Sequence, residues 1–114
     1  MTSGMRTIIY PVKDLDQARA LYGHLLGVEP AMDAPYYVQF NVGDQAIGLD
    51  PNGHAQGMTG PLGYWHVDNI QAAVERLVAD GATLVQGVRD VGGSKQVAVV
   101  QDPDGNTIGL THSP

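Results

Sequence analysis

Tyr64 and His66 are well suited to chemistry because they stand two positions apart in the short apolar stretch 62–67. Alternation along a strand places both side chains on one face. A phenol beside an imidazole can orient an organic ligand, and the imidazole can act as a general base near neutral pH. The sequence indicates no acidic partner for His66. We therefore interpret the pair as ligand contacts, with His66 as a candidate base if the protein is an enzyme. The alternative is a polar face in contact with water.

A second polar set lies in segment 36–42, where apolar and polar residues alternate. This pattern predicts a strand with its apolar side chains toward a core and Tyr37, Gln39 and Asn41 on the opposite face. Tyr37 can stack on a flat ligand, and the two amides can donate and accept hydrogen bonds. A sheet face in contact with solvent is the equal alternative.

The composition excludes several kinds of site and partner. The chain has 114 residues and no cysteine, so disulfides, thiolate nucleophiles and cysteine-based metal sites are excluded. Its four histidines include no pair with the HxH or HxxxH spacing of common metal sites. The net charge is −6 without a basic cluster, which argues against a nucleic-acid partner and favours neutral or cationic ligands.

The hydropathy pattern argues against a membrane partner. No apolar run approaches the roughly 18 residues of a membrane span, and no charged start precedes an apolar stretch. An apolar fraction of 43% is typical of globular chains. We expect a cytoplasmic protein with one domain over 1–114.

The elements that position these residues occur twice. In the first half, a strand over 5–12 precedes a helix that Asp14 can cap. In the second half, the strand 62–67 precedes a helix that Asp68 or Asn69 can cap. The helix faces toward the core are predicted to be Leu15, Ala18, Tyr22, Leu25 and Leu26, and then Ile70, Ala73, Val74, Leu77 and Val78. Trp65 alternates with His66, so we expect it in the core.

Strand-like segments follow each helix, at 29–33, 36–42 and 45–50 and then at 82–90, 94–101 and 106–111. The glycines and serine at 92–94 predict a hairpin turn, because a phosphate-binding loop would need a following helix. Both halves close with the tripeptide Ile-Gly-Leu, at 47–49 and 108–110. The pattern predicts an α+β fold of two tandem βαβββ modules, about 5–50 and 61–112, joined by a linker over 51–60.

This repeat, with Val-Lys-Asp-Leu at 12–15 and Asp-Pro-Asp-Gly-Asn at 102–106, resembles the vicinal oxygen chelate superfamily over nearly the whole chain. That superfamily includes glyoxalase I, extradiol dioxygenases, fosfomycin-resistance enzymes and bleomycin-resistance proteins. The resemblance implies a mixed sheet curled into a cup, with the helices outside and the ligand inside. One fold hosts many reactions, so the resemblance indicates the fold more specifically than the chemistry.

The resemblance also implies where a metal ion would be held, by side chains from the first, fourth, fifth and eighth strands. These positions carry Thr7, Gly48, Leu62 and Gly109, none of which offers an imidazole or a carboxylate. We therefore predict no metal ion and no other cofactor. The two glycines are expected to enlarge the cup and leave room for a flat or bulky ligand.

Together these observations predict metal-independent binding of a small organic molecule, neutral or cationic, in the cup. Sequestration of a drug, as in the bleomycin-resistance type, is the nearest analogy, and a homodimer is expected from the resemblance. The predicted ligand contacts are Thr7, Tyr37, Gln39, Asn41, Gly48, Leu62, Tyr64, His66 and Gly109. The alternatives are a glyoxalase-like lyase or isomerase or a dioxygenase-type enzyme of the same fold, and an accessory subunit without a ligand.

Overall fold

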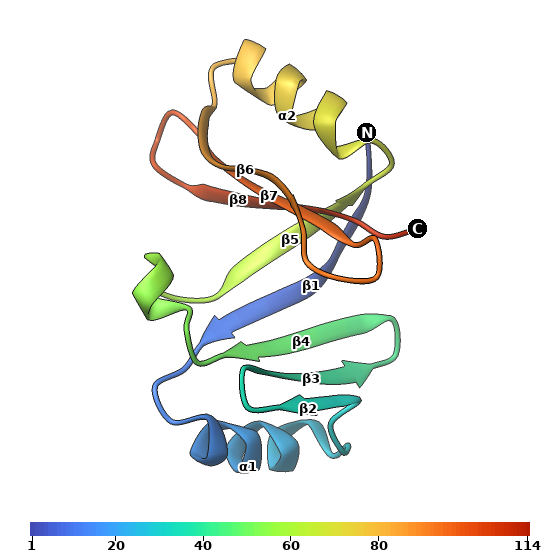
Figure 1. Cartoon of the computed structure of the whole chain (residues 1–114), viewed down its shortest axis with the longest axis vertical. Helices are drawn as coiled ribbons and strands as arrows, with labels where there is room; N and C mark the ends of the chain where they lie inside the picture. Colours follow the sequence, from blue (N-terminus) through green and yellow to red (C-terminus); the bar gives the residue numbers. More distant parts are fainter. The chain divides into compact units, whose positions relative to one another are not determined.

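The computed structural model describes residues 1–114 and contains the predicted strand–helix–three-strand order twice (Figure 1). The first repeat consists of β1 (Thr2–Pro11), α1 (Leu15–Leu26), β2 (Met32–Ala34), β3 (Tyr37–Val42) and β4 (Gln45–Asp50). After a short 3-10 helix, η1 (His54–Gln56), the second repeat consists of β5 (Leu62–Val67), α2 (Ile70–Ala79), β6 (Thr83–Asp90), β7 (Gln96–Gln101) and β8 (Thr107–His112). The predicted α+β class is confirmed.

The chain divides into two compact units. The α1 unit comprises Arg6–Leu62, and the α2 unit comprises Met1–Met5 together with Gly63–Pro114. The strands of the two repeats follow the orders β2-β3-β4-β1 and β5-β8-β7-β6. In both, the first strand of the repeat runs parallel to the last, and the other pairs are antiparallel. The sheet is therefore mixed, and each repeat uses its helix as the crossover that a parallel pair requires.

In the α1 unit, the helix is capped as predicted. The side chain of Asp14 accepts a hydrogen bond from the backbone N–H of Gln17 (3.0 Å). Gly27 ends the helix in the left-handed region at φ 70°, and its N–H donates to the carbonyl of Gly23. The helix packs on β3 and β4, where Val38 and Phe40 are fully buried. The polar residues of β3 consequently lie on the face away from α1, as the alternation predicted.

In the α2 unit, Asn69 rather than Asp68 caps the helix, because its side chain accepts a hydrogen bond from the N–H of Ala72 (3.0 Å). The core beneath α2 contains Val67, Ile70, Ala73, Val74, Ala98 and Leu110. Both faces of β7 are buried, since Val97, Ala98, Val99 and Val100 all exclude solvent. This explains why alternation in the sequence does not divide this strand.

Three apolar residues expected in the cores are exposed instead. Leu25 is 74% exposed and Val78 43% exposed, so each lies at the edge of its helix's apolar face rather than within it. Trp65 is 39% exposed. It comes two residues before Val67, the point on β5 where the core cluster beneath α2 begins, and it is not part of that cluster. These three predictions were wrong because periodicity gives a side chain's direction but not the extent of the surface that covers it.

The connections are tight turns. Lys95 donates from its backbone to the carbonyl of Gly92 (3.0 Å), so segment 92–95 is a hairpin turn as predicted. Gly92, Gly93 and Ser94 all have positive φ there. The largest differences from the expected boundaries are at two strand starts: β1 begins at Thr2 rather than residue 5, and the short β2 begins at Met32 rather than residue 29. Neither helix is long and apolar enough to cross a membrane.

Candidate functional site

The polar side chains of β3 form a hydrogen-bonded row on the face of the sheet away from α1. Tyr37 donates its hydroxyl to Oε1 of Gln39 (3.3 Å), and Nε2 of Gln39 donates to Oδ1 of Asn41 (2.9 Å). Tyr37 and Gln39 are half-buried and Asn41 is exposed. We call Tyr37, Gln39 and Asn41 the polar row. The sequence placed these three residues on one face, and the structure joins them.

Beside the polar row, β4 carries only small residues on the same face. Gln39 is paired with Gly48, and Asn41 is paired with Ala46. On the other side of β4, β1 places Ile9 next to Gly48 and Thr7 next to Ala46. Because Gly48 and Ala46 project so little, they form a low strip between the polar row and β1.

The ring of Tyr37 lies across Gly48. A Cβ atom at Gly48 would overlap the Tyr37 hydroxyl oxygen and would stand 2.7 Å from Cζ, closer than non-bonded carbon atoms approach. The glycine is therefore required for the tyrosine to lie where it does. The expectation that Gly48 leaves room for a ligand directly above it is wrong, because a side chain of the same unit fills that space.

The α2 unit repeats this arrangement. Tyr64 is paired with Gly109, and a Cβ atom at Gly109 would stand 2.7 Å from Cδ1 of Tyr64 and 2.8 Å from the carbonyl oxygen of Gly63. Tyr64 is buried, with 8% of its surface exposed. In both Ile-Gly-Leu tripeptides, then, a tyrosine ring from the same unit covers the glycine. The room predicted above Gly109 is filled in the same way.

His66 lies on the same strand face as Tyr64, as predicted. It is half-buried and is paired with Thr111, which is buried and donates its hydroxyl to the carbonyl of Gln96 (3.1 Å). The backbone carbonyl of His66 accepts a hydrogen bond from the hydroxyl of Thr2 (2.7 Å). Alternation on β5 thus places Tyr64 and His66 together in the α2 unit.

The predicted contacts fall into the two units as follows. In the α1 unit are Thr7, Tyr37, Gln39, Asn41 and Gly48, which share one face of three neighbouring strands, and Leu62 at the last residue of that unit. In the α2 unit are Tyr64, His66 and Gly109. Thr7 is buried, with 3% of its surface exposed, and Leu62 is half-buried.

The residues at the implied ligand positions do not fit a divalent metal ion. Gly48 and Gly109 provide no side-chain donor, and tyrosine rings occupy the space that a donor there would need. Nowhere do three or more His, Asp or Glu side chains gather closely enough to hold a metal ion. His112 has a structural contact instead, with its Nδ1 3.0 Å from the carbonyl oxygen of Val67.

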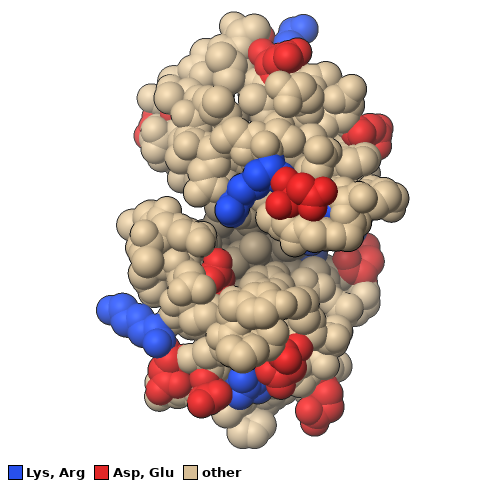
Figure 2. Space-filling view, viewed as in Figure 1, with Lys and Arg blue, Asp and Glu red and all other residues tan.

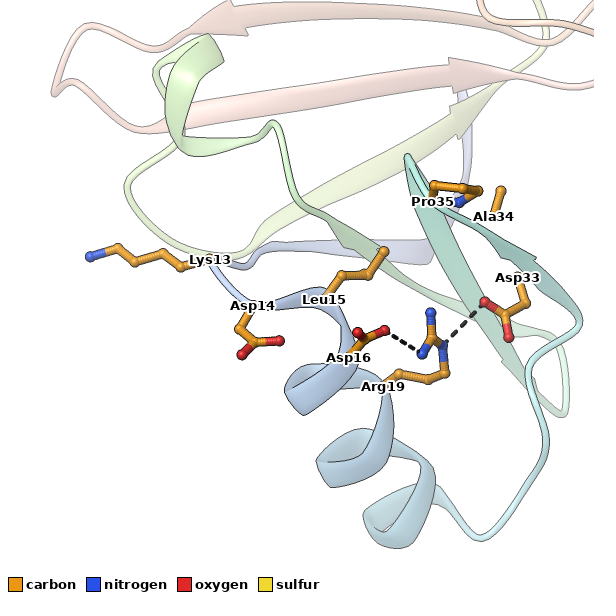
Figure 3. A pocket seen from close by; sticks show the side chains of 8 residues that line it. All are labelled: Lys13, Asp14, Leu15, Asp16, Arg19, Asp33, Ala34 and Pro35. Carbon is orange, nitrogen blue, oxygen red and sulfur yellow. Dashed lines mark hydrogen bonds and ion pairs between the residues drawn. The ribbon is translucent and has the colours of Figure 1, made fainter.

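One pocket lies away from all of these residues and was not predicted. Its volume is about 690 Å³, and it is lined by Lys13, Asp14, Leu15, Asp16, Arg19, Asp33, Ala34 and Pro35 (Figure 3). Arg19 stands between two carboxylates, at 2.8 Å from Asp16 and 3.1 Å from Asp33. The hydrogen bond with Asp16 raises the pKa of Arg19. Because β2 brings Asp33 to the start of α1, no local spacing in the sequence could reveal this pocket.

On the face that Figure 2 draws, charged side chains do not form a binding surface for a polyanion. Figure 2 shows acidic and basic side chains dispersed over one face of the molecule without a continuous basic patch. Asp50, which shares the strand face of Gly48, accepts a hydrogen bond from the backbone of Asn52 (2.8 Å) and belongs to the turn after β4. The polar row and the strip beside it contain no charged residue.

The fold and these sites define a protein built from two βαβββ repeats, with its polar strand faces turned away from the helices. The family model described as the Glyoxalase/Bleomycin resistance protein/Dioxygenase superfamily matches residues 4–110. The chain therefore belongs to that superfamily, as the resemblance in the sequence indicated. No curated protein sequence matches the chain.

Solved structures share the fold at low sequence identity. Methylmalonyl-CoA epimerase from Mycobacterium tuberculosis is 20% identical, with a TM-score of 0.73 over 99% of this chain and 89% of its own. A glyoxalase/bleomycin resistance protein/dioxygenase superfamily member from Vibrio splendidus 12B01 is 18% identical, with a TM-score of 0.70 over 96% and 99%. The Mn(II)-bound glyoxalase from Novosphingobium aromaticivorans is 18% identical, with a TM-score of 0.72 over 97% and 39%. These likenesses establish the fold and not an activity.

Proposed function

We propose that this protein binds a small organic molecule, neutral or cationic, without the help of a metal ion. The observation that carries the proposal is the covering of Gly48 by Tyr37 and of Gly109 by Tyr64. At both positions the chain places an aromatic ring in the space where a metal-binding relative would need a donor side chain. Aromatic rings and neutral amides are the groups that organic ligands contact in pockets.

The polar row and the strip beside it are the part of the site that we assign to ligand contact in the α1 unit. Tyr37 supplies a ring for stacking, Gln39 and Asn41 supply hydrogen bonds, and Thr7 shapes the floor, while Gly48 makes room for the Tyr37 ring. Leu62, Tyr64 and His66 are the remaining proposed contacts, and Gly109 makes room for the Tyr64 ring. Sequestration of a drug, as bleomycin-resistance proteins achieve, is one form that this function would take.

The proposal is tested by a thermal-shift screen of the purified protein against aromatic and cationic natural products. A compound at 100 times its dissociation constant stabilises a protein by about 2.7 kcal/mol. Tyr37→Ala should abolish the shift that a hit produces. Tyr36→Ala is the matched control, because Tyr36 is the adjacent tyrosine and is 63% exposed. An unchanged shift in Tyr37→Ala, or loss of the shift in both variants, would contradict the assignment.

Metal analysis of the purified protein is a second and independent test. We expect no divalent ion at stoichiometric level, and no change in the ligand-induced shift after treatment with a chelator. A tightly bound ion in a one-to-one ratio with the chain would overturn the metal-independent proposal.

An enzyme of the same fold is the alternative, and the structural neighbours favour it because they include an epimerase and a glyoxalase. In that case His66 is the candidate base. His66→Ala should then remove turnover while the hit from the screen still binds. If the protein only binds its ligand, the same variant weakens binding and there is no turnover to lose.

Pairing as a homodimer and a cytoplasmic location are further parts of the proposal, and both come from the sequence. The dimer is expected because family members of this size usually complete their sites by pairing. The mass of the purified protein measured by light scattering tests it directly. A mass of 12.1 kDa, that of one chain, at every concentration would contradict the dimer.

A further inference from the structure

We infer that the polar row selects planar, uncharged ligands that present a carbonyl or a similar hydrogen-bond acceptor along one edge. The inference rests on the ligand-binding function proposed above and narrows the class of ligand from neutral or cationic to neutral.

The direction of the hydrogen bonds in the polar row determines which donor and acceptor groups remain for a ligand. Oε1 of Gln39 accepts from Tyr37, and Oδ1 of Asn41 accepts from Gln39. Both amide oxygens are therefore engaged within the row. The second N–H of Gln39 and both side-chain N–H groups of Asn41 make no further hydrogen bond within the chain. Because these remaining groups are donors, the row matches a ligand that accepts hydrogen bonds.

The surface beside the row determines the shape of the ligand. Each amide of the row is paired with a small residue on β4, Gln39 with Gly48 and Asn41 with Ala46. Thr7 and Ile9 border the far side of this strip. At one end of the strip the ring of Tyr37 lies across Gly48. The part of the strip that this ring does not cover is at Ala46, beside Asn41. A flat molecule placed there would have its edge toward the amides and would lie next to an aromatic ring.

The charge of the surface determines the charge of the ligand. Tyr37, Gln39, Asn41, Ala46, Gly48, Thr7 and Ile9 are all uncharged. A cation placed there would meet N–H donors and no carboxylate, and an anion would approach a chain of net charge −6. A neutral acceptor such as an amide, ketone or lactam accepts hydrogen bonds from these donors. It avoids both the unpaired charge of a cation and the repulsion of an anion.

Three probes of similar size test the inference by NMR titration of the amide signals of Gly48, Gln39 and Asn41. Benzamide is planar, neutral and carries a carbonyl; benzamidine is planar but cationic and has only donors; cyclohexanecarboxamide has the carbonyl without the planar ring. We expect saturable shifts with benzamide, and binding about ten-fold weaker with each of the other two.

The variant Asn41→Asp tests the donor role of Asn41 specifically. It replaces the side-chain NH2 group with a second carboxylate oxygen and leaves Oδ1 to accept from Gln39. We expect it to weaken benzamide about ten-fold and to bind benzamidine more tightly than the unmodified protein does. Gln45→Glu adds the same charge on the next strand, where alternation points the side chain to the opposite face, and it should change neither probe.

The outcomes separate this inference from the function on which it rests. Tighter binding of benzamidine than benzamide to the unmodified protein, or no effect of Asn41→Asp, would overturn the ligand class. Binding that still depends on Tyr37 would then leave the proposed function standing. Failure of all three probes to shift Gly48, Gln39 or Asn41 would overturn the inference, and the library screen with Tyr37→Ala would decide the function by itself.

Discussion

At the scale of residues, the pairing of a tyrosine with a glycine occurs once in each unit. Tyr37 comes from β3, the antiparallel neighbour of the strand that carries Gly48, whereas Tyr64 comes from β5, the parallel neighbour of the strand that carries Gly109. The two repeats thus cover equivalent glycines from different strands. Similar coverage reached from different neighbours indicates that an aromatic cover, rather than a particular strand pairing, is the common feature of the two sites.

Gly48 and Tyr37 should behave as a coupled pair in stability measurements. Gly48→Ala should lower the free energy of unfolding by about 1–3 kcal/mol, because its Cβ overlaps the Tyr37 ring. In a Tyr37→Ala background the same substitution should cost much less, which a double-mutant cycle by urea denaturation would measure. Gly87→Ala is the control, because a Cβ at Gly87 meets no atom within 4 Å. Equal costs of Gly48→Ala in both backgrounds would contradict the coupling.

Alternation predicted which side chains of β3 are buried and which form the polar row, because Val38 and Phe40 lie against α1. It could not predict that the ring of Tyr37 would lie across a neighbouring strand. That arrangement depends on the register of Gln39 with Gly48, which joins residues from two strands, and on a side-chain rotamer. The exposure of Trp65 was missed for a related reason, since burial depends on the limits of the core beneath α2.

At the scale of elements, the capped helices show which features local sequence can predict and which it cannot. Asp14 caps the start of α1 as the sequence predicted, and Gly27 ends the helix in the left-handed region. The choice between Asp68 and Asn69 required the geometry of the hydrogen bond to Ala72. The pocket at the start of α1 required the position of β2, a strand that begins at Met32 rather than at the expected residue 29.

Gly23 in the middle of α1 gives a prediction for this helix. A Cβ there would stand 3.6 Å from Cε1 of Phe40, an ordinary van der Waals contact. Gly23→Ala should therefore raise the free energy of unfolding by about 0.5–1 kcal/mol, since glycine is a poor helix former. Gly27→Ala should instead destabilise the protein, because Gly27 has φ 70°. Thermal unfolding of the two variants checks the opposite signs of these effects. Destabilisation by Gly23→Ala would contradict the prediction and would show that α1 packs too closely on β3 for a Cβ at this position.

The turn before β8 gives a prediction for pH. The side-chain hydrogen bond from Asn106 is the main cause that lowers the pKa of Asp102 below its ordinary value of 3.8, and the backbone N–H groups of Asn106 and Asp104 contribute. A carboxylate whose pKa is lower in the folded state stabilises the fold above its ordinary pKa, and this stabilisation disappears as the pH falls through the lowered value. Asp102→Asn should therefore be less stable than the unmodified protein near neutral pH.

This difference in stability between Asp102→Asn and the unmodified protein should shrink as the pH falls below about 4. Denaturant unfolding at a series of pH values measures it. Asp104→Asn is the control in the same turn, because no hydrogen bond to the Asp104 carboxylate is present. A difference that stays constant down to about pH 2 would contradict the assignment of the effect to the Asp102 carboxylate.

At the scale of the whole molecule, family membership indicates the fold, whereas the residues at particular positions bear on the function. The family model matches residues 4–110, and the solved neighbours include an epimerase and a glyoxalase, so the fold alone is compatible with catalysis. The residues at particular positions, above all the two covered glycines, are what favour binding without a metal ion. The repeat and the α+β class were readable from the sequence because strands, caps and turns recur in the same order.

The first strand also limits how the two repeats could be separated. Residues Met1–Met5 belong to the α2 unit, where Thr2 bonds to the carbonyl of His66 and Met5 lies against Gly63. A cut after residue 62 would therefore deprive the later fragment of a segment that only the earlier one contains. If the chain arose by duplication of a half-length ancestor, its second half has since come to depend on residues Met1–Met5, and it could be produced as a separate protein only with those residues joined to it.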